Sequence, residues 1–244
     1  MPRNSLLAAA FFLALNPSVF AQDESQSMAA GRPGETYISA TVANRGIQWE
    51  SGLSYDDDSD LSVFQFNFST FKVGIRDCAE VWLDLGGAVA NSHAGVSALS
   101  LGGKFRFYDG SDFVPAFALV ATVTPPVGLS ELRPDHCGAF LNLVADNTLP
   151  GLDDFDYAFN AGYEFDESLF SFNLYLDYNV SDRLYVFVEN NDYIHNSSDR
   201  YVNFDCGVAF LPTDNWQLDL SLGHGVGAAN AQWSVSAGFV WLIK

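Results

Sequence analysis

A strict alternation of apolar and polar side chains constrains the fold of this chain more than any other feature of its sequence. It is clearest over residues 170–190, FSFNLYLDYNVSDRLYVFVEN, where two alternating runs flank the turn-forming stretch NVSDR. Successive strand side chains point to opposite faces, so the stretch predicts a β-hairpin with one apolar face. In a soluble sandwich that face would pack on a core, whereas in a membrane barrel it would face lipid.

The alternation continues from residue 45 to the end of the chain, with few interruptions. It predicts about twelve strands, near 46–56, 61–76, 78–90, 95–108, 113–125, 137–148, 155–166, 169–180, 183–192, 201–212, 215–225 and 231–243. Short Asp, Asn, Ser and Gly turns alternate with mostly longer connections, as expected for the two ends of a barrel. In the second strand the apolar phase shifts between Phe68 and Phe71, which predicts a β-bulge near Ser69 and Thr70.

Charge separates the two phases of these strands. The apolar phase is nearly free of charge, and aromatic side chains recur toward the strand ends. We therefore predict an all-β, closed, antiparallel up-and-down transmembrane β-barrel over residues 45–244, with a soluble β protein as the alternative. The polar phase would line the lumen. Its predicted lumen-lining residues are Glu50, Lys72, Glu80, Asp84, Lys104, Arg106, Asn142, Asp146, Asn160, Glu164, Asp177, Glu189, Asp205 and Asp219.

The N-terminal region has the composition of an exported precursor. Residues 1–21 combine a basic start, an apolar run and a small-residue cleavage site, which predicts a signal peptide and export. Together with the predicted barrel, export predicts a location in the outer membrane. Residues 22–44 lack periodicity and are expected to form a periplasmic lead-in. The formal net charge of -19 argues against a nucleic-acid partner, which would require a basic surface.

The charged lumen predicts what the barrel does. An acidic interior favours neutral or cationic solutes over organic acids, so we expect passive passage of small solutes. Lys72, Glu80, Lys104 and Arg106 fall on neighbouring strands and are expected to form a salt-bridged cluster, while acids elsewhere on the wall would line the solute path. A plugged or purely structural barrel is the alternative.

The predicted external rim carries residues suited to two further kinds of chemistry. His93, His136, His195 and His224 all fall in or beside the predicted external loops, but no pair has the spacing of a metal site. A hydrolase could be drawn from rim His and Asp residues, yet no nucleophile motif occurs. We therefore expect no enzyme activity, no metal and no cofactor. The expected partners are outer-membrane lipid, a small-molecule solute and, during biogenesis, the barrel-assembly machinery.

Several stretches resemble an outer-membrane barrel family labelled as meta-pathway phenol-degradation proteins and often called transporters. They include FKVGIRDCAEVWLDL, LSLGGKFRFYDGSDFVPAFALVATVTPPVG and RPGETYISATVANRGIQWESG, and the match continues through FNAGYEF, DRLYVFVEN and DLSLGHG. The positions that carry these motifs are Lys72, Gly74, Glu80, Lys104, Pro126 and Gly128. The resemblance implies outer-membrane transport and points to aromatic or other hydrophobic cargo. The chain departs from the family pattern at Lys72, where Arg is more usual, and in ending FVWLIK rather than on an aromatic residue.

Overall fold

The computed structural model of the chain describes residues 28–57, 62–90, 93–130, 133–195, 199–227 and 233–243. The predicted signal peptide, residues 1–21, lies outside these ranges. Within them, no helix is long and apolar enough to cross a membrane.

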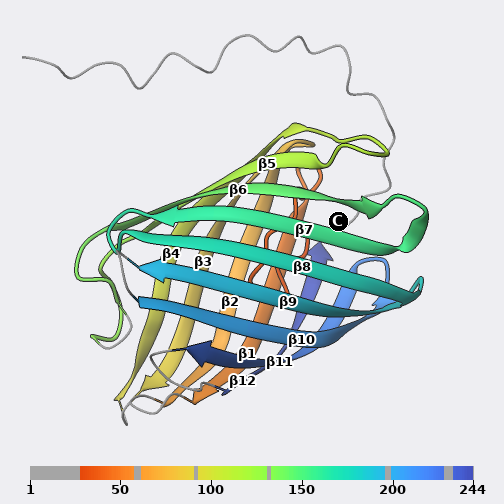
Figure 1. The fold of residues 1–244 in the computed structure, drawn as a ribbon. Helices are drawn as coiled ribbons and strands as arrows, with labels where there is room; N and C mark the ends of the chain where they lie inside the picture. Colours follow the sequence, from red (N-terminus) through yellow and green to blue (C-terminus); the bar gives the residue numbers. More distant parts are fainter. Residues whose placement is uncertain are drawn as a thin grey trace, which may run out of the picture.

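The described chain forms one closed barrel of twelve antiparallel strands (Figure 1). Each strand pairs with its neighbours in sequence, and pairing of β1 with β12 closes the wall. This confirms the predicted fold class and strand number. The strands are β1 Ile47–Asp57, β2 Ser62–Arg76, β3 Ala79–Ala90, β4 His93–Tyr108, β5 Ala116–Thr124, β6 Gly138–Leu149, β7 Leu152–Glu164, β8 Leu169–Ser181, β9 Leu184–His195, β10 Asp199–Thr213, β11 Trp216–Gly227 and β12 Trp233–Ile243.

The alternating pattern of the sequence becomes the two faces of the wall. On β8, Leu174 is 56% exposed on the outside of the barrel, whereas its neighbour Asn173 is 6% exposed on the inside. Phe170 and Phe172 share the outer face with Leu174. Because successive side chains of a strand point to opposite faces, the apolar side chains of the wall point outward and the polar side chains point into the barrel.

The two ends of the barrel differ. The chain enters β1 and leaves β12 at one end, here called the turn end, where short connections such as Pro150–Gly151 also lie. The opposite end is called the loop end. Outside the wall near the turn end, Trp49, Trp216 and Trp241 form an aromatic cluster with Phe71 and Phe239, and the Trp49 and Phe239 ring centroids are 5.0 Å apart. Such a cluster is typical of a membrane interface.

The predicted bulge in β2 is present slightly earlier than expected. The pairing of β2 with β3 shifts register between Phe66 and Ser69, and its pairing with β1 shifts between Gly52 and Ser54. A bulge inserts one residue and so exchanges the faces of the residues on either side. This explains why Phe64 and Phe71 both face outward although their separation is odd.

One connection at the loop end folds into the barrel. Residues 125–137 join β5 to β6, and the Leu129 amide donates to the Val96 carbonyl of β4 at 2.8 Å. The Leu129 side chain packs on a buried cluster of Val63, Ala88 and Ala90. The inner wall near the loop end is therefore locally apolar and covered by this loop.

Residues 28–44 pass through the interior of the barrel before β1 begins, and are called the inner segment (Figure 1, red to orange). The sequence predicted a periplasmic lead-in here. The structure instead places this segment against inward-facing side chains from many wall strands, and those side chains form hydrogen bonds with its backbone amides.

Candidate functional site

The inner segment has little secondary structure of its own, and the barrel wall supplies its hydrogen bonds. Backbone amides at intervals along it donate to carboxylate and amide oxygens of inward-facing wall residues and, at its end, of Asp77 in the β2–β3 turn. The pairs are Ala29 with Gln48 (3.1 Å), Gly31 with Glu50 (3.1 Å), Glu35 with Glu189 (2.9 Å), Tyr37 with Asn160 (2.8 Å), Ser39 with Asp146 (2.6 Å), Val42 with Glu80 (2.7 Å) and Asn44 with Asp77 (3.1 Å). Since enclosed backbone groups require partners, an acidic wall is well suited to hold an extended chain.

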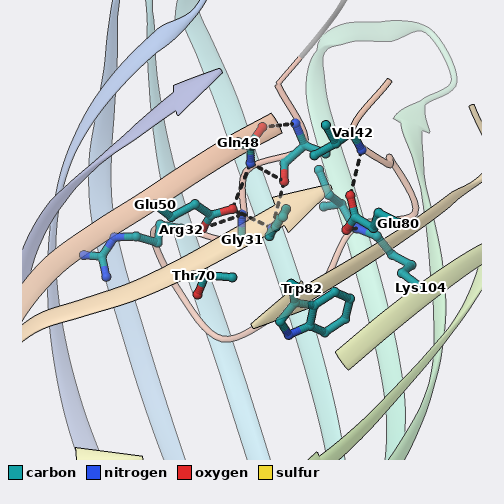
Figure 2. Close-up of polar contacts among 12 residues, drawn as sticks. Gly31, Arg32, Val42, Gln48, Glu50, Thr70, Glu80, Trp82 and Lys104 are labelled. Carbon is teal, nitrogen blue, oxygen red and sulfur yellow. Dashed lines mark hydrogen bonds and ion pairs between the residues drawn. The ribbon is translucent and has the colours of Figure 1, made fainter. Parts of the chain in front are cut away.

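Two buried ion pairs connect the wall to the same segment (Figure 2). Lys72 Nζ lies 2.5 Å from Glu50 Oε1 and also donates to the Ala29 carbonyl at 2.9 Å. Lys104 Nζ lies 3.1 Å from Glu80 Oε1 and donates to the Ile38 carbonyl at 3.0 Å. Each ammonium group therefore balances one carboxylate and binds one backbone carbonyl of the inner segment. Additional hydrogen bonds of this kind are what make a buried pair tolerable.

Arg32 anchors the inner segment to the last two strands. Its guanidinium donates to Asp219 Oδ1 at 3.0 Å and to Ser236 Oγ at 2.7 Å. Gly52 and Gly238, which are paired across the β1–β12 seam, leave room for it, because a Cβ at either position would lie within 2.8 Å of a guanidinium atom. The seam of the barrel is thus shaped around this side chain.

The structure places most of the predicted lumen-lining residues in contact with the inner segment. These are Glu50, Lys72, Glu80, Lys104, Asp146, Asn160, Glu189 and Asp219. The others make contacts within the wall or line the cavity described below. Asp84 accepts hydrogen bonds from Thr70, Trp82 and Ser100, and Asp205 accepts one from Asn191. Arg106 donates to the Asp77 carbonyl, and Asn142 donates to Asn160. Glu164 lines the cavity, and one carboxylate oxygen of Asp177 is buried without a hydrogen-bond partner.

The expected salt-bridged cluster has a different membership. Glu80 and Lys104 are directly opposite each other on β3 and β4 and form a pair, but Lys72 pairs with Glu50 of β1. Arg106 lies one step nearer the turn end and forms an ion pair with Asp109 at 2.9 Å. Of the acids elsewhere on the wall, which were expected to line a solute path, Asp146, Glu189 and Asp219 instead hold the inner segment.

A cavity of about 420 Å³ remains between the inner segment and the wall. It is lined from the inner segment by Gly31, Gly34, Glu35, Thr36 and Tyr37. From the wall it is lined by aromatic, polar and charged side chains, including Phe68, Trp82, Asp84, Phe140, Asn142, Glu164, Ser171 and Tyr193. Phe140, Glu164, Ser171 and Tyr193 lie toward the loop end of β6 to β9, whereas Glu50, Lys72, Glu80 and Trp82 lie toward the turn end of β1 to β3. The cavity therefore extends from the inner segment toward the loop end along β6 to β9.

Glu35 is the carboxyl of the inner segment that extends into this space. The Tyr193 hydroxyl donates to Glu35 Oε2, and the Glu35 amide is held by Glu189. The Glu35 side chain is exposed to the lumen, but it lies inside the barrel, where the surrounding wall partly desolvates its carboxyl. This enclosure raises the pKa of Glu35, and the nearby carboxylates of Asp205 and Asp56 act in the same direction.

Sequence reasoning missed the inner segment and therefore Arg32 and Tyr37. One signal was available: Arg32 is a basic residue between Gly31 and Pro33, in a stretch that precedes a strongly acidic barrel. The four histidines do lie at the loop end, and His224 stacks on Trp233 with ring centroids 4.2 Å apart. In the described ranges, no three His, Cys, Asp or Glu side chains converge as a metal site.

An apolar outer wall around a charged interior defines an outer-membrane-type β-barrel. Residues 30–243 match the family described as "Putative MetA-pathway of phenol degradation", and the chain belongs to that family. This confirms the resemblance seen in the sequence. No curated protein matches the chain by sequence.

Solved structures share the fold. An outer-membrane channel from Pseudomonas putida F1 aligns with a TM-score of 0.63 and 13% identity, over 87% of this chain and 99% of that one. The KdgM porin aligns with a TM-score of 0.58 and 11% identity, over 80% and 99% of the two chains. The NanC porin aligns with a TM-score of 0.59 and 8% identity, over 79% and 98%. At these identities the likeness concerns the fold alone.

Proposed function

We propose that this protein is an outer-membrane channel for passive passage of small solutes, with its bore narrowed by the inner segment. The observation that supports this most directly is the cavity of about 420 Å³ beside that segment, inside a barrel whose outer surface suits lipid. The aromatic cluster near the turn end would lie at one membrane interface, and insertion would use the barrel-assembly machinery.

The charge of the lumen supports neutral or cationic cargo. Carboxylates outnumber cations along the inner wall, and both buried lysines are already paired. A fixed negative potential concentrates cations and repels organic acids. The family name adds aromatic or hydrophobic compounds to the candidate cargo.

The test is single-channel conductance of the refolded protein in a planar bilayer under a salt gradient. We expect small, stable conductance steps and a reversal potential of the sign that indicates cation selectivity. Anion selectivity would contradict the electrostatic argument.

A closed, structural barrel is the second candidate function. It is favoured by the number of wall side chains that bind the inner segment, and a twelve-stranded barrel lies between those filled by side chains and those holding open water. Absence of conductance from a correctly folded barrel, together with conductance after the inner segment is displaced, would support this second reading.

A further inference from the structure

The cavity beside the inner segment is bordered by polar atoms that lack partners. Among the described residues, Asn142 Oδ1, Ser171 Oγ and Thr36 Oγ1 are buried without a hydrogen bond, and all three residues line this cavity. Asn142 is 1% exposed and Ser171 is 6% exposed. Buried polar groups are nearly always hydrogen-bonded, so three such atoms around one space indicate a polar occupant.

The orientation of the Asn142 amide is fixed by the inner segment. Tyr37 donates its amide to Asn160 Oδ1 at 2.8 Å, and Asn160 Nδ2 returns a bond to the Tyr37 carbonyl at 2.9 Å. Asn142 Nδ2 donates to the same Asn160 Oδ1 at 3.0 Å. The remaining Asn142 atom is therefore an acceptor, and its partner must offer an O–H or N–H group.

The register of these residues suits a molecule with polar groups on both sides of a ring. Asn142, Gly162 and Ser171 are in register across β6, β7 and β8. Neighbouring strands are about 4.8 Å apart, so the backbones of Asn142 and Ser171 are about 10 Å apart across the wall. The Ser171 hydroxyl extends from β8 over Gly162, 2.5 Å from where a Cβ at position 162 would lie. Between them Gly162 has no side chain, and the Phe140 ring extends over it, 2.6 Å from where a Cβ would lie. A flat apolar surface thus separates two polar positions.

Charge and further aromatic side chains narrow the ligand class. Tyr37 and Trp82 also line the cavity, with ring centroids 6.2 Å apart. Its charged border contains several carboxylates and one cation, Lys72, which is already paired with Glu50. A carboxylate-bearing ligand would be repelled, whereas a neutral ring could pack on the aromatic faces.

We propose that this cavity is a recognition site for an uncharged, ring-shaped solute that carries two or more hydroxyl groups. The ligand donates to Asn142 Oδ1 and exchanges hydrogen bonds with the Ser171 and Thr36 hydroxyls. The inference rests on the proposed channel function, because a solute entering from the loop end would meet this site above the inner segment. The site is incomplete without that segment, which supplies Thr36 and orients Asn142.

The experiment is isothermal titration of the folded, detergent-solubilised protein with matched probes. Resorcinol and methyl glucoside represent aromatic and saturated neutral rings, and 3,5-dihydroxybenzoate and glucuronate are their charged counterparts. We expect saturable binding of at least one neutral probe, and at least tenfold weaker binding of its charged counterpart. Binding of neither neutral probe, or equal binding of the charged one, would overturn the proposal, and the neutral probe that binds identifies the kind of ring.

Variants distinguish specific recognition at this cavity from non-specific binding elsewhere in the lumen. Ser171→Ala removes a hydroxyl that has no protein partner, so the fold should persist while binding weakens about fivefold to tenfold. Gly162→Ala should abolish binding, because its methyl group would displace the Phe140 ring and the Ser171 hydroxyl. Ser54→Ala is the control, since its hydroxyl donates to Asp56 and does not line this cavity. Equal binding by all three variants would contradict the proposed site.

A parallel conductance measurement distinguishes failure of this site from failure of the channel. Conductance without saturable binding would contradict the proposed recognition site and support the proposed channel. Saturable binding without conductance would contradict the proposed channel and indicate a barrel that binds the ligand without conducting it. The shift in electrophoretic mobility on heating shows in each case that the barrel was folded.

Discussion

The Ala43 carbonyl oxygen occupies the space that a side chain at Gly74 would need. A Cβ at position 74 would lie 2.0 Å from that oxygen and 2.4 Å from the Val42 carbonyl oxygen. The Gly74 carbonyl also accepts a hydrogen bond from the Arg45 amide at 2.9 Å, at the point where the inner segment leads into β1. The absence of a side chain at Gly74 thus leaves the space in which the end of the inner segment packs against the wall.

Gly74→Ala should dislodge the end of the inner segment and raise channel conductance. Backbone atoms cannot move aside as a flexible side chain can, so the segment itself must shift while the β2–β3 pairing persists. Gly103→Ala on β4 is the control, because the nearest atom to its Cβ would be 3.4 Å away. Single-channel recordings of both variants check this, and unchanged conductance of Gly74→Ala would show that the segment does not restrict the bore.

Lys104→Met should destabilise the barrel by about 3–5 kcal/mol, the cost typical of leaving a buried charge without its partner. The Glu80 and Lys104 side chains are 1% and 3% exposed, so water cannot solvate the remaining carboxylate. The double variant Lys104→Met, Glu80→Gln should recover much of the loss, because no charge then remains buried at this pair. Urea unfolding in phospholipid vesicles provides the measurement. A single variant within about 1 kcal/mol of the native protein would mean that this pair is well hydrated.

Glu35→Gln should stabilise the folded protein near neutral pH and lose that advantage in acid. Enclosure raises the pKa of Glu35 above its ordinary value of 4.5, so the folded state binds this proton more tightly than the unfolded state does. The stability that comes from the protonated carboxyl is complete below pH 4.5 and is lost as pH rises through the raised pKa. The difference in unfolding free energy between variant and native protein should therefore grow with pH above 4.5. A difference that stays constant with pH would contradict the assignment.

Arg32→Met should loosen the inner segment at the barrel seam. It removes hydrogen bonds to Asp219 and Ser236 and leaves a buried carboxylate without a cation. Hydrogen bonds to charged groups contribute about 1.5–3 kcal/mol each, so protease cleavage within residues 28–44 should become markedly faster. Asp219→Asn in the Arg32→Met background should then have a smaller effect than in the native background. Strictly additive effects would show that the two residues do not interact in solution.

Much of the barrel could be predicted from residue order because alternation is a local property. The expected strand 169–180 is close to the observed Leu169–Ser181, and the phase shift in β2 located the bulge to within a few residues. The expected start of β5 at residue 113 was early, since Ser111 and Val114 exchange backbone hydrogen bonds in a turn and the strand begins at Ala116.

Pairing inside the barrel could not be predicted in the same way. The inner segment has no periodicity, and Arg32 and Asp219 are 187 positions apart, a distance over which spacing carries no information. Alternation indicated that Glu50, Lys72 and Arg106 face inward but did not fix strand register. Register decides that Lys104 is directly opposite Glu80, while Arg106 lies beyond the end of β3.

The contacts of Arg32 with β11 and β12 also set an order of events in time. The residues that bind its guanidinium, Asp219 and Ser236, lie on β11 and β12, the last two strands of the barrel in chain order, and the seam that accommodates it exists only after β12 has joined β1. The inner segment precedes every strand in the chain, yet it acquires its complete set of partners only after all the strands of the barrel have assembled. Its docking reports that the barrel has closed.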